Sequence, residues 1–194
     1  ATVTTDVSSA PWVGQCDLIV TATSAFGLRV LDVSQCKPGA VILDVALPPD
    51  ISAEEAAVRP DVLVVESGEV LIPGPVRFSF DIGLPPGVAY ACLAEAALLA
   101  MEERYECFTL GRDVPPNSVK EIYRLFCKHG LQIAPLRTFG RLLTDDLIAE
   151  KKARTDELLR SPGLLERVKQ EAAAKIAKIP PRAKGVVGVT SLKP

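Results

Sequence analysis

The sequence has very little histidine and no closely spaced cysteines, and both shortages exclude kinds of site. Among 194 residues there is one histidine, His129, and none of the five cysteines stands in a CxxC pair. A zinc site needs several imidazole or thiolate ligands at short spacing, so this pattern argues against one. The odd, widely spaced set of cysteines predicts reduced thiols rather than a disulfide framework.

The sequence also lacks a strong net charge and a long apolar run. It has 22 basic and 24 acidic residues and is 48% hydrophobic, and Glu95 interrupts its longest apolar segment. A membrane span needs about 18 uninterrupted apolar residues. We therefore expect a soluble cytoplasmic protein without nucleic-acid partners or integral membrane contact.

A further absence is the GxGxxG loop, although strands of the right type are present. Three nearly continuous apolar runs are "DLIVTAT" from Asp17, "AVILDVA" from Ala40 and "DVLVVES" from Asp61. Such runs are typical of parallel strands buried on both faces. The sequence predicts the α/β class, with a partial Rossmann-like, doubly wound and mostly parallel sheet followed by carboxy-terminal helices. The absent loop belongs after the first strand of such a domain, which predicts that an amino-terminal part is missing.

Small and polar residues follow the predicted strands, where ligands bind in open α/β sheets. Threonine, serine and glycine also end strands for backbone reasons, and the residues alone leave both interpretations open. The candidate cofactor-binding residues are Thr21, Ala22, Thr23, Ser24, Asp44 and Gly68.

The segment from Gly87 to Arg104 predicts a helix that is apolar on all sides and therefore buried. It carries Cys92, which is either core filling or a reactive thiol favoured by the start of a helix. Glu95 lies on the same face, and we expect it to reach the rim or to pair with Arg104 or Arg112.

The rest of the chain predicts further helices. "NSVKEIYRLFCKHG" predicts a helix with Asn117 or Ser118 as N-cap and Gly130 after its end. From Arg137 the chain is charged and helical, with a break at Ser161 and a flexible tail after Ile179. The predicted division is a later half of a dinucleotide-binding domain in 1–86, a helical part with the nucleophile in 87–136, and a charged extension in 137–194.

The stretch "AYACLAEAALLAMEERYECFTLGRD", followed by "KHGLQIAPL", resembles the long-chain acyl-[acyl-carrier-protein] reductases of cyanobacteria and their relatives. Upstream, "CDLIVTATSA", the "LD" of "VILDVA" and the "FDI" of "FSFDIG" match the later Rossmann strands and the following loop of that family. The resemblance covers about Ala1 to Leu136.

The resemblance implies an NADPH-dependent reductase that converts a fatty acyl thioester to a fatty aldehyde, with Cys92 as the acyl-accepting nucleophile. It implies NADPH at the strand ends and an acyl carrier protein or coenzyme A thioester as partner, together with an aldehyde-consuming enzyme. The family's amino-terminal region and glycine-rich loop are absent, so we expect this piece to be inactive alone.

Two other functions stay open on the residues. One is an oxidoreductase like shikimate or amino-acid dehydrogenases, which would use the same half of a Rossmann domain without covalent catalysis. The other is a noncatalytic nucleotide-binding or assembly module, with the charged tail as its working surface.

Overall fold

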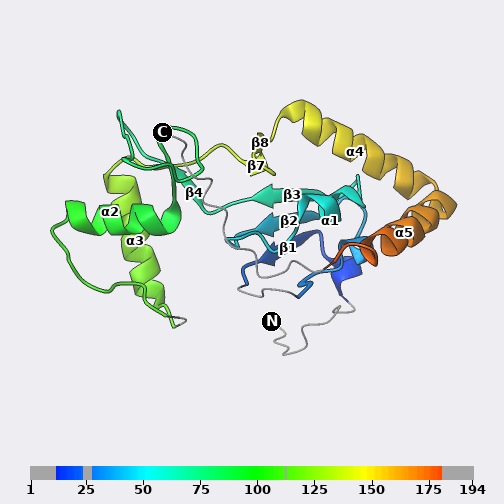
Figure 1. Cartoon of the computed structure of the whole chain (residues 1–194), viewed down its shortest axis with the longest axis horizontal. Coiled ribbons are helices and arrows are strands. Elements are labelled where there is room, and N and C mark those ends of the chain that lie inside the picture. Colours follow the sequence, from blue (N-terminus) through cyan, green and yellow to red (C-terminus); the bar gives the residue numbers. More distant parts are fainter. Residues whose placement is uncertain (1–11, 24–27, 112, 181–194) are drawn as a thin grey trace. The chain divides into compact units, whose positions relative to one another are not determined.

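The computed structural model describes residues 12–23, 28–111 and 113–180, and the chain forms two compact units (Figure 1). The sheet unit consists of Ala1–Ser67 together with Leu136–Pro194, and the helix-pair unit consists of Gly68–Pro135. The predicted division into 1–86, 87–136 and 137–194 was made by function and not by packing, and it stays a prediction.

The sheet unit is built on three parallel strands, β1 (Leu18–Thr21), β2 (Val41–Asp44) and β3 (Leu63–Glu66). They pair in that order, with Leu18, Val41 and Leu63 side by side. Each lies inside one of the predicted apolar runs, which confirms the α/β class. A fourth, weaker run that the sequence offers as a strand, "ATVTTD" from Ala1, lies outside the described residues.

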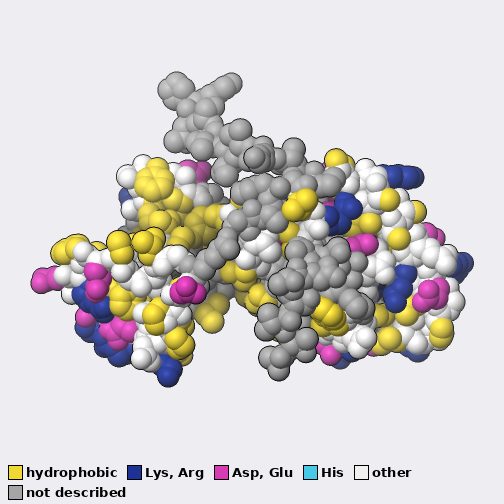
Figure 2. All heavy atoms as spheres, turned by 90° about the horizontal axis from the view of Figure 1, so that it is seen from below, with side chains coloured by type: hydrophobic (Ala, Val, Ile, Leu, Met, Phe, Trp, Pro, Cys, Tyr) yellow, Lys and Arg dark blue, Asp and Glu magenta, His cyan; other side chains and the backbone are white. Residues whose placement is uncertain are grey.

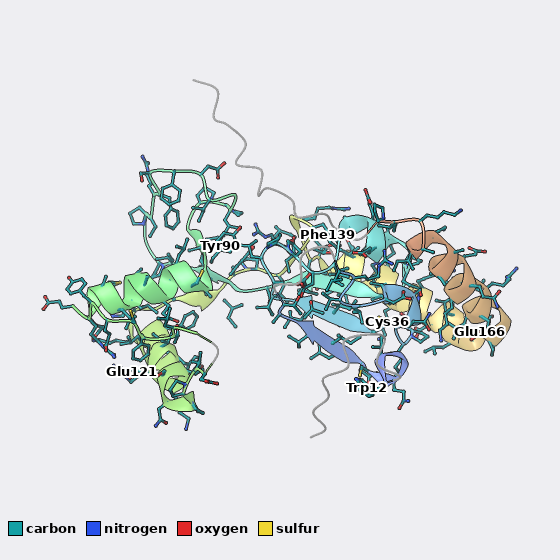
Figure 3. The ribbon with its side chains drawn as sticks, turned by 60° about the horizontal axis from the view of Figure 1, so that its bottom comes forward. Trp12, Cys36, Tyr90, Glu121, Phe139 and Glu166 are labelled. Carbon is teal, nitrogen blue, oxygen red and sulfur yellow. The ribbon has the colours of Figure 1, made fainter. Side chains whose placement is uncertain are left out.

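A short hairpin extends this sheet on the β3 side. Strand β7 (Arg137–Thr138) pairs antiparallel with β3, and β8 (Arg141–Leu142) pairs antiparallel with β7. Phe139, labelled in Figure 3, and Gly140 form its two-residue turn. Their φ values are 47° and 75°, and the favoured two-residue hairpin turn has such positive φ values at both central residues. The result is a mixed five-stranded sheet in the order β1-β2-β3-β7-β8.

Short helical segments precede or connect the parallel strands. Two 3-10 turns, η1 (Val13–Gln15) and η2 (Val33–Gln35), precede β1 and β2, and α1 (Ala53–Ala57) joins β2 to β3. Helix α1 begins with a capping box, because the Ser52 hydroxyl accepts from the Glu55 amide and the Glu55 carboxylate accepts from the Ser52 amide.

Two helices follow the hairpin, α4 (Asp145–Arg160) and α5 (Pro162–Ile176). The predicted break at Ser161 is confirmed, since Pro162 begins a new helix. Proline is well suited to this first position, because the amide hydrogen that it lacks would have no partner within the helix. Helix α5 packs against η2 and one face of the sheet. The buried core there contains Leu31, Val33, Cys36, Ala40, Ile42, Ile51, Val58, Val62, Val64, Ala172 and Ile176.

A buried ion pair stands just before β3. Nε and Nη2 of Arg59 donate to the two carboxylate oxygens of Asp61 at 2.9 and 2.6 Å, and both side chains are fully buried. Nη1 of Arg59 donates to the carbonyls of Ser34 and Cys36, each at 2.9 Å. The charges are therefore paired and hydrogen-bonded, which buried charges require.

The helix-pair unit combines a small antiparallel sheet with two helices. The sheet has the order β5-β4-β6, with bounds Val88–Tyr90, Glu69–Leu71 and Gln132–Ile133. The helices are α2 (Ala91–Met101) and α3 (Pro116–Lys128). Their shared core consists of Val70, Ala94, Leu98, Leu99, Leu125 and Leu131.

Three details of these helices differ from the prediction. Helix α2 begins at Ala91 rather than at Gly87, because residues 88–90 pair with β4 as a strand. It buries only part of its surface, and Leu93 and Met101 are exposed. Helix α3 begins at Pro116, with Pro115 as N-cap in place of Asn117 or Ser118. As predicted, Gly130 follows its C-cap with a left-handed backbone.

Ion pairs join the ends of α2 and α3. The Glu102 carboxylate accepts from Lys128 Nζ at 2.6 and 2.8 Å and contacts His129 Nε2 at 2.6 Å. Arg104 bonds Glu106 and Glu121. Figure 2 shows the mixed acidic and basic side chains of this unit.

None of the helices in the described ranges is long and apolar enough to cross a membrane.

Replacing Arg59 with Met should lower the free energy of unfolding by about 3–5 kcal/mol, because Asp61 would be left buried without its partner. Lys37→Met, which removes the exposed pair with Asp17, should cost about 0–1 kcal/mol. Urea denaturation measures both. Adding Asp61→Leu to Arg59→Met should recover part of the loss, and equal losses in the two single variants would contradict the assignment.

Candidate functional site

The carboxyl end of β2 holds a buried carboxylate. Asp44 lies opposite Thr21 in the sheet. Its Oδ1 accepts from the amide of Ala46 at 3.1 Å and its Oδ2 from the amide of Ile51 at 2.9 Å. Burial raises the pKa of Asp44, against the lowering effect of these two amides and of the Thr21 hydroxyl. Asp44 thus organises the loop after β2, and its predicted role in cofactor binding stays a prediction.

The loop after β1 is held in a similar way. The amide and hydroxyl of Thr23 donate to the two oxygens of Asp50 at 3.0 and 2.6 Å. Ala22 beside it is exposed, and Ser24 lies outside the described residues. The structure therefore brings Thr21, Thr23 and Asp44 to one end of the sheet, where their hydrogen bonds shape the two loops.

Gly68 belongs to the helix-pair unit, where it lies at the start of α2. Its φ is 85°, a left-handed value that favours glycine, and its carbonyl accepts from the amide of Ala91 at 2.8 Å. Ala91 immediately precedes Cys92. Within the helix-pair unit, the structure thus brings Gly68 next to the residue that precedes the predicted nucleophile.

Cys92 is exposed, which corrects the prediction that it is buried or nearly so. It is the second residue of α2, one residue after Ala91 and two after Tyr90, the N-cap (Figure 3). The helix dipole acts within this first turn. The later start of the helix therefore places the thiol where the dipole is felt. Its assignment as a nucleophile stays a prediction.

Among the described residues, the hydrogen-bond partner of Glu95 is a hydroxyl. The Thr109 hydroxyl donates to Glu95 Oε1, while Arg104 bonds Glu106 and Glu121 instead. Arg112 lies outside the described residues. The pairing with Arg104 is not formed, because the loop after α2 brings Thr109 back to the helix. Glu95 is half-buried, which agrees with the alternative that it reaches the rim.

His129 does not serve Cys92 as a base. Its Nε2 lies against Glu102, the C-cap of α2, and Cys92 is ten residues earlier in the same helix. At 1.5 Å per residue this separation is about 15 Å. Among the residues with described positions, no group of three or more histidine, cysteine or acidic side chains could hold a metal ion. What the geometry offers at Cys92 is an accessible thiol without an imidazole base.

Some structural partners were missed by sequence reasoning. Thr109 and Asp50 act across 14 and 27 residues of sequence, and nothing in the local pattern identifies such partners. The capping box of α1 was recognisable, because Ser52 and Glu55 have the S-x-x-E spacing. The "RPD" before β3 contains both members of the buried ion pair, Arg59 and Asp61, although the sequence pattern by itself indicates only a turn.

The chain is similar to the aminotransferase PigE of Serratia sp. (strain ATCC 39006). The two sequences are 38% identical over 129 residues, which is 65% of this chain and 15% of the length of PigE. No protein-family profile matches the chain.

This similarity contradicts the predicted family and activity. The relative is an aminotransferase, so the assignments as an acyl-[acyl-carrier-protein] reductase, as a fatty-aldehyde-forming oxidoreductase and as an NADPH-binding protein are wrong. The similarity to an aminotransferase also replaces the two alternatives, a dehydrogenase-like oxidoreductase and a noncatalytic module. The prediction had relied on an alanine-rich helix around a cysteine, and such a helix is also explained by packing. The partners that it implied stay predictions.

The thiols should react with iodoacetamide according to their positions. Cys92 and Cys127 are both exposed, but Cys92 begins α2 and Cys127 lies in the last turn of α3. The dipole should make Cys92 about two- to five-fold faster, as followed by peptide mass mapping. Burial raises the pKa of Cys36 to about 11, so this thiol should react only after denaturation.

Cys127→Ser is the matched control, because it should leave the rate at Cys92 unchanged, and the exposed Cys107 is followed in its own peptide. Equal rates at the two cysteines would show that the start of α2 does not activate its thiol.

The contacts of Glu102 with Lys128 and His129, which we call the clasp between α2 and α3, should weaken in acid. Hydrogen bonds from Lys128 and His129 lower the pKa of Glu102 from its ordinary value of 4.5. The clasp then contributes stability that is fully present above about pH 4.5 and is lost as pH falls through the lower folded pKa.

Glu102→Gln should remove this part of the acid dependence, measured as the urea midpoint against pH, while the neighbouring Glu103→Gln should keep it. Parallel pH profiles for Glu102→Gln and the parent would contradict the clasp.

Proposed function

We propose that this chain is a region of a transaminase-related polypeptide and that it lies outside the part that holds the cofactor. The observation that carries the first half is the 38% identity to PigE over 129 residues. Because the match spans 15% of that relative, most of an aminotransferase of this kind lies elsewhere in its chain. The second half depends on whether the lysines described in the structure suit pyridoxal phosphate, the cofactor of aminotransferases.

Pyridoxal phosphate acts as an electron sink in amino-group transfer, and its proteins share a set of requirements. A lysine amine carries the cofactor, an acidic or basic group faces the pyridine nitrogen, and the phosphate needs an anion site. The lysine must lose its proton readily, which burial promotes. These requirements identify Lys151 as the first lysine to test in this chain.

Lys151 meets one requirement and fails the others. It is half-buried, and burial lowers its pKa. Its Nζ donates to the Val62 carbonyl at 3.2 Å, next to the amino end of β3, whereas ligands bind at the carboxyl ends of such strands. The adjacent buried carboxylate, Asp61, has both oxygens bonded to Arg59. Asp61 therefore has no free oxygen to face a pyridine nitrogen.

Two other described lysines are already paired. Lys37 bonds the exposed Asp17, and Lys128 bonds Glu102 between the helices. Both lysine side chains are exposed to solvent, so neither is enclosed in the way that orients a cofactor. The carboxyl ends of β1 and β2 are no better suited, since Asp44 and Asp50 are committed to loop hydrogen bonds. Lys151, Lys37 and Lys128 therefore do not fit pyridoxal phosphate.

The geometry supports a role next to such a centre rather than within it. The sheet unit is a scaffold whose polar groups close its own loops. The helix-pair unit presents Cys92 to solvent at the start of α2, and this thiol is our candidate for a reactive residue of the region. The rest of the polypeptide would supply the cofactor and the amino-group chemistry.

Pyridoxal phosphate should label this chain as it labels any lysine-bearing surface. After borohydride reduction, intact mass should show sub-stoichiometric label spread over several lysines, and Lys151→Met should remove no more of it than Lys152→Met. Lys152 is the adjacent, exposed control. Uptake of one equivalent that is lost specifically in Lys151→Met would overturn the proposal.

A further inference from the structure

Strand β1 is an edge strand with a row of backbone groups that face outward. Among the described strands it pairs with β2 alone, at one end of the order β1-β2-β3-β7-β8 (Figure 1). The carbonyls of Asp17 and Thr21 accept from the amides of Val41 and Val45, so they point toward β2. Backbone groups alternate along a strand, so those of Leu18 and Val20 point away from the sheet.

The side chains of these two residues are also uncovered. Leu18 is 59% and Val20 57% exposed, while Ile19 between them packs on the core. On the same face of the sheet, Val41 and Leu43 of β2 are half-buried, and Val65 of β3 is buried. The apolar face therefore becomes more exposed from β3 toward β1.

Nothing on β1 protects this edge by the usual means. Exposed edges in native proteins carry lysine, proline, a bulge or an inward charge, and β1 reads Leu-Ile-Val-Thr. Parallel strands of such composition are normally covered on both faces and continued on both sides. An open edge of this kind is a template for one more strand.

We infer that an apolar β-strand from polypeptide outside residues 1–194 pairs with the outer edge of β1 and covers Leu18 and Val20. This inference rests on the proposed function, because a transaminase-related polypeptide of the relative's length carries most of its residues outside the region that matches this chain. A tethered strand pays little for association, since linkage gives it a high effective concentration.

A second copy of the chain is the weaker candidate for the same edge. Strand β1 has four residues, and a pair of such strands offers little area compared with the roughly 1,200 Å² that a stable interface buries. A strand continued into the fold of the same polypeptide meets no such requirement. The added strand would also continue the apolar face of β1, β2 and β3.

Amide hydrogen exchange, resolved by NMR, tests the edge directly. In the isolated chain the amides of Leu18 and Val20 should exchange freely, while those of Ile19 and Thr21, which face β2, should be protected. In the whole transaminase-related polypeptide all four should be protected, with exchange at Leu18 and Val20 slowed at least a hundredfold. Free exchange of Leu18 and Val20 in the whole polypeptide would overturn the inference.

Protection of Leu18 and Val20 in the isolated chain would also overturn it. Protection that grows with protein concentration would favour a second copy, and protection that does not depend on concentration would favour a segment of the chain itself that lies outside the described residues. Leu18→Lys provides an independent test against Leu142→Lys, since both leucines are 59% exposed and lie on opposite edges of one sheet. Both variants should leave the thermal midpoint of the isolated chain unchanged, and Leu18→Lys alone should lower that of the whole polypeptide.

Equal midpoints for the two lysine variants in the whole polypeptide would contradict the added strand. These readouts do not depend on amino-group transfer. A protected edge in a polypeptide without transaminase activity would reject the proposed function and leave the added strand in place.

Discussion

The buried pair of Arg59 and Asp61 is the interaction on which the sheet unit depends. Arg59 joins the connection before β2 to the start of β3 through the carbonyls of Ser34 and Cys36. Thr155 of α4 adds a hydrogen bond to the Asp61 carbonyl. Because the desolvated charges must stay together, the strand, the connection and the helix are fixed around one point. The interactions that hold these segments together therefore lie at the amino end of the parallel strands.

The opposite end of the strands shows how a residue that looks functional can be structural. Asp44 and Asp50 are acidic residues at the edge where α/β proteins bind ligands, yet both accept hydrogen bonds that shape the loops. Their chemistry is used within the fold. The thiol of Cys92 is different, because it is exposed at a helix start. The candidate chemistry of the chain therefore lies in the helix-pair unit.

The parts of the fold that sequence predicted are those with a local periodic signal. The three parallel strands and the break at Ser161 follow from runs of apolar residues and from one proline. The start of α2 was misplaced because Val88 to Tyr90 are apolar in either structure, and pairing with β4 decides between them. The exposure of Cys92 depends on which segments pack against α2, and the amino-acid composition of the helix does not reveal them. The family was mistaken for a related reason, since a cysteine in an apolar helix has more than one explanation.

The central claim is that this chain belongs to a transaminase-related polypeptide whose cofactor is held elsewhere. The most direct measurement is to reduce the active whole polypeptide with borohydride and to locate the modified lysine by peptide mass mapping. The account predicts one lysine, labelled stoichiometrically, in a peptide outside residues 1–194. A stoichiometric label on a lysine of this chain, Lys151 above all, would contradict it.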